Sequence, residues 1–257
     1  MADALAVAMD AARVAGRQLL ESFGGEATGI GAKSSLTDLV SDADRESELA
    51  IVSAIRWAFP EDAIVAEEGS LERGGSGRTW YIDPLDGTVN YLYGIPHWSV
   101  SIACVDERGG LVGVVFDPCR DELFSGERGA GAHVGRSRLA VSEQGDLAHA
   151  LIATGFAYVA EARAAQTLLF RTLLPAVRDI RRFGSAALDL AWLSRGRIDG
   201  YFESGVQDWD VAAGSLLVRE AGGAVTEVGG IGHDRRPGLF ASNGRIHEPL
   251  RALLVPS

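Results

Sequence analysis

Apolar residues recur at helical spacing in two segments, residues 2–23 and 42–59. Intervals of three and four residues place such side chains on one face of a helix, and charged residues fill the opposite face of the first segment. The residues expected to share the apolar face are Leu5, Met9, Ala12, Leu19 and Phe23 in the first segment and Leu49, Val52, Ile55 and Phe59 in the second. The pattern therefore predicts two amphipathic helices.

Strand-like patterns follow these helices. Short apolar runs that end in acidic residues occupy 63–68 and 79–83, and alternation around turn residues predicts an antiparallel meander over 98–135. The second half alternates, with strands expected at 151–155, 179–182, 198–203, 224–228 and 238–242 and helices at 161–177, 185–195, 210–221 and the C-terminal end. We predict an α/β (α+β) fold with lobes at 1–145 and 146–257 that form a single compact catalytic unit.

The bulk composition narrows the class of protein. A chain of 257 residues with 47% hydrophobic content can bury a large core. Its formal net charge of −11 argues against a nucleic-acid partner, because phosphate backbones attract basic patches. The chain contains no apolar run of about 18 residues, as a membrane span needs, and its first residues do not resemble a signal peptide. We therefore expect a cytoplasmic globular protein without a membrane partner.

Several motifs with known chemistry are absent or incomplete. GAGAHVG at 129–135 resembles a dinucleotide-binding loop, but its third glycine comes one residue late and no helix pattern follows, so we predict a hairpin connection. Cys104 and Cys119 lack metal-site spacing and are expected to be reduced. The sequences GxxxxGK[ST], GxSxG and HExxH do not occur. An aspartyl-phosphate phosphatase would need DxDx[TV], whereas DADRE at 42–46 lacks the Thr or Val.

Acidic residues stand at the ends of apolar runs in four places. They are Glu67 with Glu68, Asp83 with Asp86, Glu203, and Asp210. Taken alone, DPLDGT at 83–88 is equally well an N-capped turn, and a single acidic pair is a solvated surface more often than a ligand set. Their joint occurrence favours a binding site, because strand ends and helix starts commonly bind ligands in α/β folds. Carboxylate ligands favour hard cations, Mg²⁺ before Mn²⁺ or Ca²⁺.

The DPLDGT spacing has its own physical logic. Pro84 stiffens the turn, and Gly87 lets the backbone approach a ligand closely. A helix that begins near Thr88 would direct free N–H groups at a phosphate beside the metals. Two cations roughly 4 Å apart would then suit phosphoryl transfer to water.

Five ordered blocks carry a family resemblance. They are KSSLTDLVSDAD, VAEEGS, WYIDPLDGTVNYLYGIPHWSVSIA, RRFGSAALDLAWLSRGRIDGYFE and WDVAAGSLLVREAGG, and they span nearly the whole chain. In these blocks the sequence resembles the inositol monophosphatase family of Mg²⁺-dependent, lithium-sensitive phosphatases. The resemblance implies a layered αβαβα sandwich of the inositol monophosphatase / fructose-1,6-bisphosphatase type, usually a homodimer.

The resemblance also implies roles for individual residues. Ligands of a first metal would be Glu67, Asp83 and the carbonyl of Leu85, and ligands of a second would be Asp83, Asp86 and Asp210, with a third, weaker Mg²⁺ on Glu67 and water. Thr88, assisted by Asp44 and Glu67, would orient the attacking water, and the amides of Gly87 and Thr88 would receive the phosphate. Positions that contact inositol hydroxyls match Asp86, Ala186, Glu203 and Asp210. Lys33 matches a mobile-loop lysine near the metals.

The resemblance favours hydrolysis of myo-inositol monophosphate, a small phosphorylated polyol. Fructose-1,6-bisphosphatase, histidinol phosphatase and phosphoadenosine phosphatase activities remain alternatives, ranked lower because only Arg181 and Arg182 stand out as basic residues near the second lobe's core motif. A member with an added transcription-machinery-binding role is a further alternative. Asp208 stands where close bacterial relatives often carry proline, and we interpret it as solvated surface.

Overall fold

The computed structural model describes residues 3–25, 30–32, 39–40 and 42–255. Its helices are α1 (Ala4–Ser22), α2 (Asp42–Ala58), α3 (Thr88–Leu92), α4 (Ala160–Thr167), α5 (Phe170–Leu173), α6 (Ala186–Ser194), α7 (Asp208–Glu220) and α8 (His247–Leu254), with 3₁₀ turns η1 (Leu147–His149) and η2 (Leu174–Ala176). The strands of the first half are β1 (Gly31–Ala32), β2 (Leu39–Val40), β3 (Ala63–Ala66), β4 (Leu71–Glu72), β5 (Thr79–Asp86), β6 (Ser99–Asp106), β7 (Gly109–Asp117), β8 (Glu122–Glu127), β9 (Gly131–Val134) and β10 (Ser137–Arg138). Those of the second half are β11 (Leu151–Thr154), β12 (Asp179–Arg181), β13 (Gly200–Ser204), β14 (Ala224–Val228) and β15 (Gly238–Ser242).

Two large sheets organise the molecule. The first has the order β10-β9-β8-β7-β6-β5-β3-β4 and is antiparallel except between β3 and β5. The second has the order β12-β11-β13-β15-β14, with β11 parallel to both of its neighbours. The predicted meander and hairpin are confirmed, because β6 to β9 pair in sequence and GAGAHVG supplies the turn into β9 and the strand itself.

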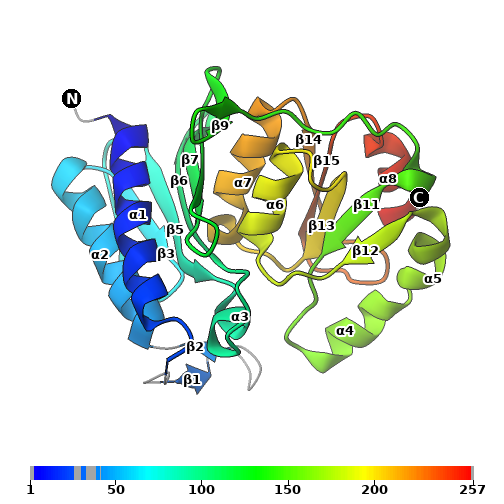
Figure 1. Cartoon of the computed structure of the whole chain (residues 1–257), viewed down its shortest axis with the longest axis horizontal. Coiled ribbons are helices and arrows are strands. Elements are labelled where there is room, and N and C mark those ends of the chain that lie inside the picture. Colours follow the sequence, from blue (N-terminus) through cyan, green and yellow to red (C-terminus); the bar gives the residue numbers. More distant parts are fainter. Residues whose placement is uncertain (1–2, 26–29, 33–38, 41, 256–257) are drawn as a thin grey trace.

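Helices and sheets alternate in five layers (Figure 1). Helices α1 and α2 cover one face of the first sheet, and α6 and α7 lie between the two sheets. Side chains of α5 and α8 pack on the far face of the second sheet. Four apolar clusters fill the spaces between these layers, which confirms the expected αβαβα sandwich. No helix in the described ranges has the length and apolar character to cross a bilayer.

The first helix approaches the sheet closely because its buried face is built from small residues. Ala8, Ala12 and Ala15 are fully buried there. A Cβ added to Gly16 would lie only 2.5 Å from the Phe116 ring and 2.8 Å from Pro118. Gly16 therefore belongs to the packing of α1 against β7.

Two predictions about helices are wrong in detail. Leu49 is 63% exposed, whereas the polar neighbours Ser47 and Glu48 are buried in its place. Ser47 Oγ donates to the Pro84 carbonyl, 2.9 Å away, and Glu48 accepts two backbone N–H groups, so hydrogen bonds rather than apolar contacts turn this face inward. The helix predicted at 161–177 is divided into α4, α5 and η2, and Pro175 lies within the last of these.

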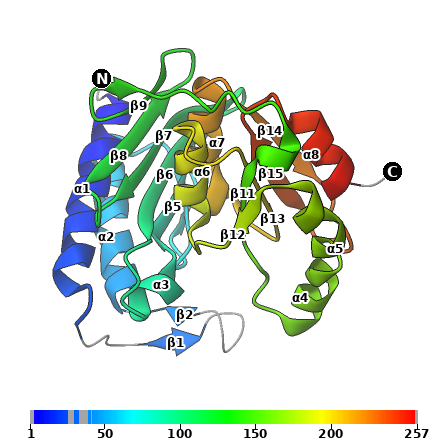
Figure 2. The same ribbon diagram turned by 45° about the vertical axis from the view of Figure 1, so that its right-hand side comes forward.

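Both cysteines are free thiols, as predicted. The division into lobes near residue 145 stays a prediction. Figure 2 shows the chain from a second direction, in which the first sheet is built from the first half and the second sheet from the second half, while α6 and α7 of the second half pack between them.

Candidate active site

A cavity of about 340 Å³ lies where strand ends of both sheets meet the starts of α3, α6 and α7. It brings together nine of the predicted site residues: Glu67, Asp83, Leu85, Asp86, Gly87, Thr88, Ala186, Glu203 and Asp210. Asp44 contributes from behind Thr88, and Lys33 lies outside the described residues. Residues separated by more than 140 positions in the sequence therefore line one cavity.

A bulge in β5 accounts for the shared direction of Asp83 and Asp86. In a regular strand, residues three apart point to opposite faces. The register of β5 against β6 shifts between Asp83 and Asp86, at Pro84, which has no N–H to give to the ladder. The Asp83 carboxylate also accepts the backbone N–H of Leu85 at 3.0 Å, which stabilises the turn. The bulge therefore directs both carboxylates into the cavity.

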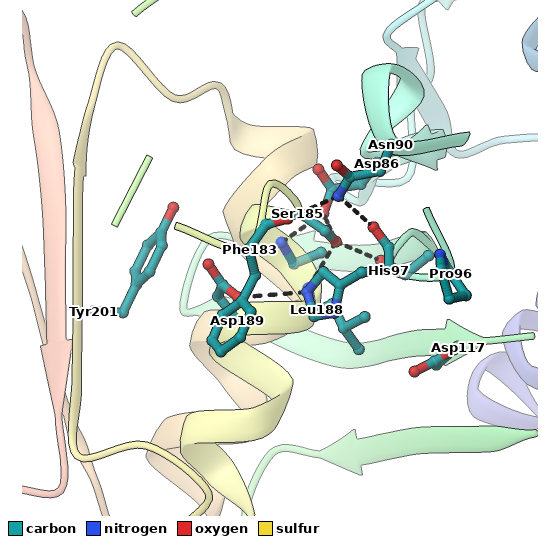
Figure 3. Close-up of polar contacts among 12 residues, drawn as sticks. Asp86, Asn90, Pro96, His97, Asp117, Phe183, Ser185, Leu188, Asp189 and Tyr201 are labelled. Carbon is teal, nitrogen blue, oxygen red and sulfur yellow. Dashed lines mark hydrogen bonds and ion pairs between the residues drawn. The ribbon is translucent and has the colours of Figure 1, made fainter. Parts of the chain in front are cut away.

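Asp86 is held by the start of α6 (Figure 3). Its Oδ2 accepts the Ser185 hydroxyl at 2.5 Å and the Ala187 backbone N–H at 2.8 Å. Ser185 is also the N-cap of α6, where its Oγ accepts the N–H of Leu188. Burial raises the pKa of Asp86 to about 7, and the two hydrogen bonds oppose that rise.

Asn90 of α3 links the segments on either side of the contact between Asp86 and the start of α6. Its amide donates to the carbonyls of His97 and Phe183, both at 2.7 Å (Figure 3). One side chain thus joins α3, the chain before β6 and the chain before α6. Asn90 belongs to the DGTVN stretch, so this motif supplies a clamp as well as candidate ligands.

Asp210 enters the cavity from the first turn of α7. Its Oδ2 accepts the backbone N–H of Gln207 at 2.7 Å, in a capping box at the start of that helix. Burial, together with the nearby charges of Glu67, Asp86 and Glu203, holds the pKa of Asp210 well above its usual range. Burial and the charges of Glu67, Asp86 and Asp210 do the same for Asp83.

Glu67 follows β3, and a buried carboxylate positions the turn that carries it. Glu48 of α2 accepts the backbone N–H groups of Glu68 at 2.7 Å and Ser70 at 3.0 Å. Glu48 is only 4% exposed, so these two hydrogen bonds replace the water that would otherwise solvate its carboxylate. Glu48 therefore acts as a positioning residue for Glu67.

Thr88 lies at the start of α3, between two acceptors. Its hydroxyl is 3.1 Å from Asp44 Oδ1 and 3.1 Å from the Leu85 carbonyl, and Asp44 is fully buried. The helix begins at Thr88, as predicted, but spans only five residues, so its dipole is small. Gly87 has φ of +95° and lies near the Gly184 and His97 carbonyls, which suits glycine alone.

Glu203 closes the cavity on the side of the second sheet. Its Oε2 accepts the hydroxyl of Tyr201 at 2.8 Å, which leaves Oε1 as its other acceptor. A Cβ on Gly155, which follows β11, would lie 1.9 to 2.1 Å from the carboxylate atoms. Burial raises the pKa of Glu203, and the hydrogen bond from Tyr201 and the charges of Arg182 and Arg236 oppose the rise.

The charge of the cavity suits cations. Six carboxyl groups and two guanidinium groups line it, so its formal charge with all of them ionised is minus four, which two divalent ions would cancel. All-oxygen donors of this kind fit Mg²⁺. No three His, Cys, Asp or Glu side chains among the described residues are already drawn into a closed ligand set. The Oδ2 atoms of Asp86 and Asp210 accept backbone and hydroxyl donors, which leaves the Oδ1 atom of each carboxylate for a cation.

The cavity is also lined by residues that were not predicted as part of the site, among them Gly155, Asp189 and Arg236. Gly155 follows a strand without a distinctive motif, Asp189 is a helix residue of an apolar stretch, and Arg236 comes from the segment before β15. Their sequence neighbourhoods carry no signal of the kind that marks DPLDGT. Of the basic pair noted in the sequence, Arg182 lines the cavity, while Arg181 pairs with Asp179.

Asp208 is exposed and is not among the residues that line the cavity. It forms a hydrogen bond with Tyr81, which together with burial raises the pKa of that tyrosine. Its exposure agrees with the interpretation of Asp208 as solvated surface, which stays a prediction because the neighbouring Gln207 and Trp209 line the cavity.

Known proteins resemble this chain over most of its length. A model described as the inositol monophosphatase family matches residues 1–255. Nus factor SuhB of Pasteurella multocida (strain Pm70) is 44% identical over 231 residues, which cover 89% of this chain and 86% of that protein. The crystal structure of extragenic suppressor protein suhB from Bartonella henselae has a TM-score of 0.89 at 38% identity and covers 98% of each chain. The structure of inositol monophosphatase from Anabaena (Nostoc) sp. PCC 7120 has a TM-score of 0.82 at 37% identity and covers 97% of this chain and 94% of that one.

Proposed function

Because the chain belongs to the inositol monophosphatase family, we propose that it is a Mg²⁺-dependent phosphatase that hydrolyses myo-inositol monophosphate to inositol and phosphate. The observation that carries this proposal is the convergence of Glu67, Asp83, Asp86 and Asp210 on one cavity. Buried carboxylates that raise one another's pKa values gain stability from a shared divalent cation.

The proposed metal ligands fall into two overlapping sets. Glu67, Asp83 and the Leu85 carbonyl would hold one ion, while Asp83, Asp86 and Asp210 would hold a second. Glu67, with water, would hold a third more weakly, and Mn²⁺ would substitute for Mg²⁺. Bound ions of this kind polarise phosphoryl oxygens, activate water and stabilise the leaving alkoxide.

The chain's own groups would orient the reactants. Thr88 would hold the attacking water with its hydroxyl oxygen while donating its proton to Asp44, whose carboxylate lies 3.1 Å from it. Glu67 would accept a proton from the same water. The backbone amides of Gly87 and Thr88 would receive the phosphate oxygens.

The leaving alcohol would meet hydrogen-bond acceptors. Glu203, with Asp86, Ala186 and Asp210, would contact the hydroxyl groups of inositol. A carboxylate left without a hydroxyl donor in this buried position loses free energy, so the site would select esters of polyols over esters of alcohols that carry no further hydroxyl group. We rank fructose 1,6-bisphosphate, histidinol phosphate and phosphoadenosine phosphate lower, because bisphosphate and nucleotide esters would favour more basic residues than Arg182 and Arg236, which line the cavity.

Initial rates of phosphate release test this proposal. Inositol 1-phosphate, fructose 1,6-bisphosphate, histidinol phosphate and phosphoadenosine phosphate are compared at equal concentrations, with and without Mg²⁺. We expect the highest kcat/KM for inositol 1-phosphate and no turnover after chelation. A tenfold preference for one of the other esters would reassign the substrate, and turnover that persists after chelation would contradict the metal assignment.

The names of the relatives favour a second candidate function. Several are named Nus factor SuhB, which supports a role of this chain in the transcription machinery. A pull-down with the inactive variant Asp83→Asn separates this role from hydrolysis. Recovery of RNA polymerase components by both wild type and variant would support it, and recovery by neither would reject it. A cytoplasmic location, homodimer formation and lithium sensitivity also stay predictions.

A further inference from the structure

Arg236 lines the cavity on the side of Glu203 and is fixed there by a buried partner. Its Nε lies 3.1 Å from Asp234 Oδ1 and one terminal nitrogen, Nη2, lies 2.6 Å from Oδ2. The Asp234 side chain is only 3% exposed, whereas that of Arg236 is 39% exposed. Gln166 donates to the same carboxylate at 3.0 Å. Asp234 therefore holds one side of the Arg236 guanidinium, while the other side stays accessible.

The contacts with Asp234 use Nε and Nη2 of Arg236, so Nη1 is the nitrogen left to donate to a ligand. Nη1 lies over the backbone of Gly205, where an added Cβ would approach it to 2.4 Å. Gly205 lines the cavity too, and it follows directly on β13, which carries Glu203. A donor on Arg236 and an acceptor on Glu203 thus face the same side of the cavity.

Charge balance decides what kind of group this donor suits. The guanidinium is already neutralised by its two-point contact with Asp234, and Glu203 adds a further carboxylate nearby. A second phosphate placed here would meet Asp234 and Glu203, whose charges already balance those of Arg236 and Arg182, so it would find no excess of positive charge. A neutral hydroxyl oxygen meets no such repulsion and accepts a hydrogen bond from the charged donor.

We propose that Arg236 is a specificity-determining residue that donates a hydrogen bond from Nη1 to a substrate hydroxyl adjacent to the hydroxyl bound by Glu203. The inference rests on the proposed polyol phosphatase function and assigns its substrate class as esters with a vicinal diol. Oε1 of Glu203 then accepts a hydrogen bond from one hydroxyl, and Nη1 of Arg236 donates a hydrogen bond to the oxygen of the neighbouring hydroxyl.

Paired changes in the protein and in the substrate test this inference. Arg236→Gln and Arg236→Lys are compared with wild type and with Arg235→Gln, a matched control at an exposed neighbour outside the cavity. The substrates are inositol 1-phosphate, its monodeoxy analogues, inositol 1,4-bisphosphate and phenyl phosphate, which has no hydroxyl. Thermal melting of each variant detects loss of folding separately.

We expect Arg236→Gln to lower kcat/KM for inositol 1-phosphate by about tenfold to a hundredfold more than for phenyl phosphate. One monodeoxy analogue is expected to be turned over equally by wild type and variant, because the hydroxyl read by Arg236 is missing from it. Arg236→Lys keeps the charge but not the fork and is expected to recover only part of the loss.

Three results would overturn the inference while leaving the proposed function in place. Equal losses on inositol 1-phosphate and phenyl phosphate would make Arg236 a structural residue, and a larger loss on the bisphosphate would make it an anion receptor. If Arg236→Gln hydrolysed inositol 1-phosphate with the kcat/KM of the wild type, Arg236 would have no role in substrate recognition. Absence of wild-type turnover on every ester would instead reject the proposed function, and the inference with it.

Discussion

Replacing Gly155 by alanine tests whether Glu203 is positioned for substrate. The new Cβ would lie 1.9 to 2.1 Å from the Glu203 carboxylate atoms, whereas ordinary contact begins at 3.4 Å. The carboxylate must therefore retreat by roughly 1.3 to 1.5 Å. It cannot do so without loosening the 2.8 Å hydrogen bond from the Tyr201 hydroxyl.

The expected effect is larger on activity than on stability. A displacement of about 1 Å in a substrate-positioning group costs about a hundredfold in rate, so kcat/KM for inositol 1-phosphate should fall by about that factor. The clashing atoms lie at the end of a flexible side chain, so overpacking should cost about 1–2 kcal/mol of unfolding free energy. For a chain of this length, that corresponds to a fall in Tm of about 2–8 °C.

The assay compares Gly155→Ala with wild type and with Gly145→Ala. Gly145 has no neighbour within 4 Å of an added Cβ, so it controls for the loss of backbone entropy alone. Phosphate release from inositol 1-phosphate and from phenyl phosphate is measured beside thermal melting. We expect kcat/KM to fall for inositol 1-phosphate and to change little for phenyl phosphate.

Two outcomes would refute the reasoning. If Gly155→Ala retained kcat/KM for inositol 1-phosphate within threefold of wild type, Glu203 would not be a substrate acceptor in the position described. If the two esters lost activity equally, the substitution would act on the metal side of the cavity and not on polyol recognition.

Three further predictions concern the groups around the candidate ligands. Glu48→Gln should weaken Mg²⁺ binding by about tenfold to a hundredfold in calorimetry, because it holds the turn of Glu67, while the exposed Glu46→Gln should leave it unchanged. Ser185→Ala should cost about 1–2 kcal/mol in chemical denaturation, because it removes an N-cap and a donor to Asp86; no loss would contradict the cap. With cations chelated, stability should fall as pH rises from about 4 to about 7, since the folded protein holds the Asp86 proton more tightly than the unfolded chain. Asp86 alone should contribute at most about 4 kcal/mol to this loss, and Asp83 and Asp210, whose pKa values are also raised, should add to it; Mg²⁺ should restore the stability, and a rise in stability over this range would contradict the assignment.

Local patterns predicted most elements of the fold. The meander, the alternating second half and the buried position of Ile55 follow from apolar periodicity. Leu49 was mispredicted because periodicity counts apolar side chains and cannot anticipate that Glu48 is turned inward by amides twenty residues away. In the helix predicted at 161–177, Pro175 was a signal for the end of α5 at Leu173, whereas the separation of α4 from α5 at residues 168–169 has no proline to mark it.

The candidate site was predicted where its chemistry is concentrated in short motifs. DPLDGT supplies the proposed ligands Asp83 and Asp86, and the structure adds the bulge that directs both into the cavity. Gly155 could not be predicted, because its place depends on a contact with Glu203 that no local spacing encodes, and the nearness of Asp234 to Arg236 in the sequence does not show that this arginine reaches the cavity. Long-range packing determines which of many charged residues and glycines reach the cavity.

The central claim is that buried carboxylates of this chain hold divalent cations that enable hydrolysis of a phosphate ester. The most direct test is the rate of phosphate release from inositol 1-phosphate as a function of Mg²⁺ concentration, for wild type and Asp83→Asn. The account predicts saturable Mg²⁺-dependent turnover by the wild type and a loss of at least about a thousandfold in the variant. Turnover by Asp83→Asn close to that of the wild type, or wild-type protein that stays inactive at saturating Mg²⁺, would contradict it.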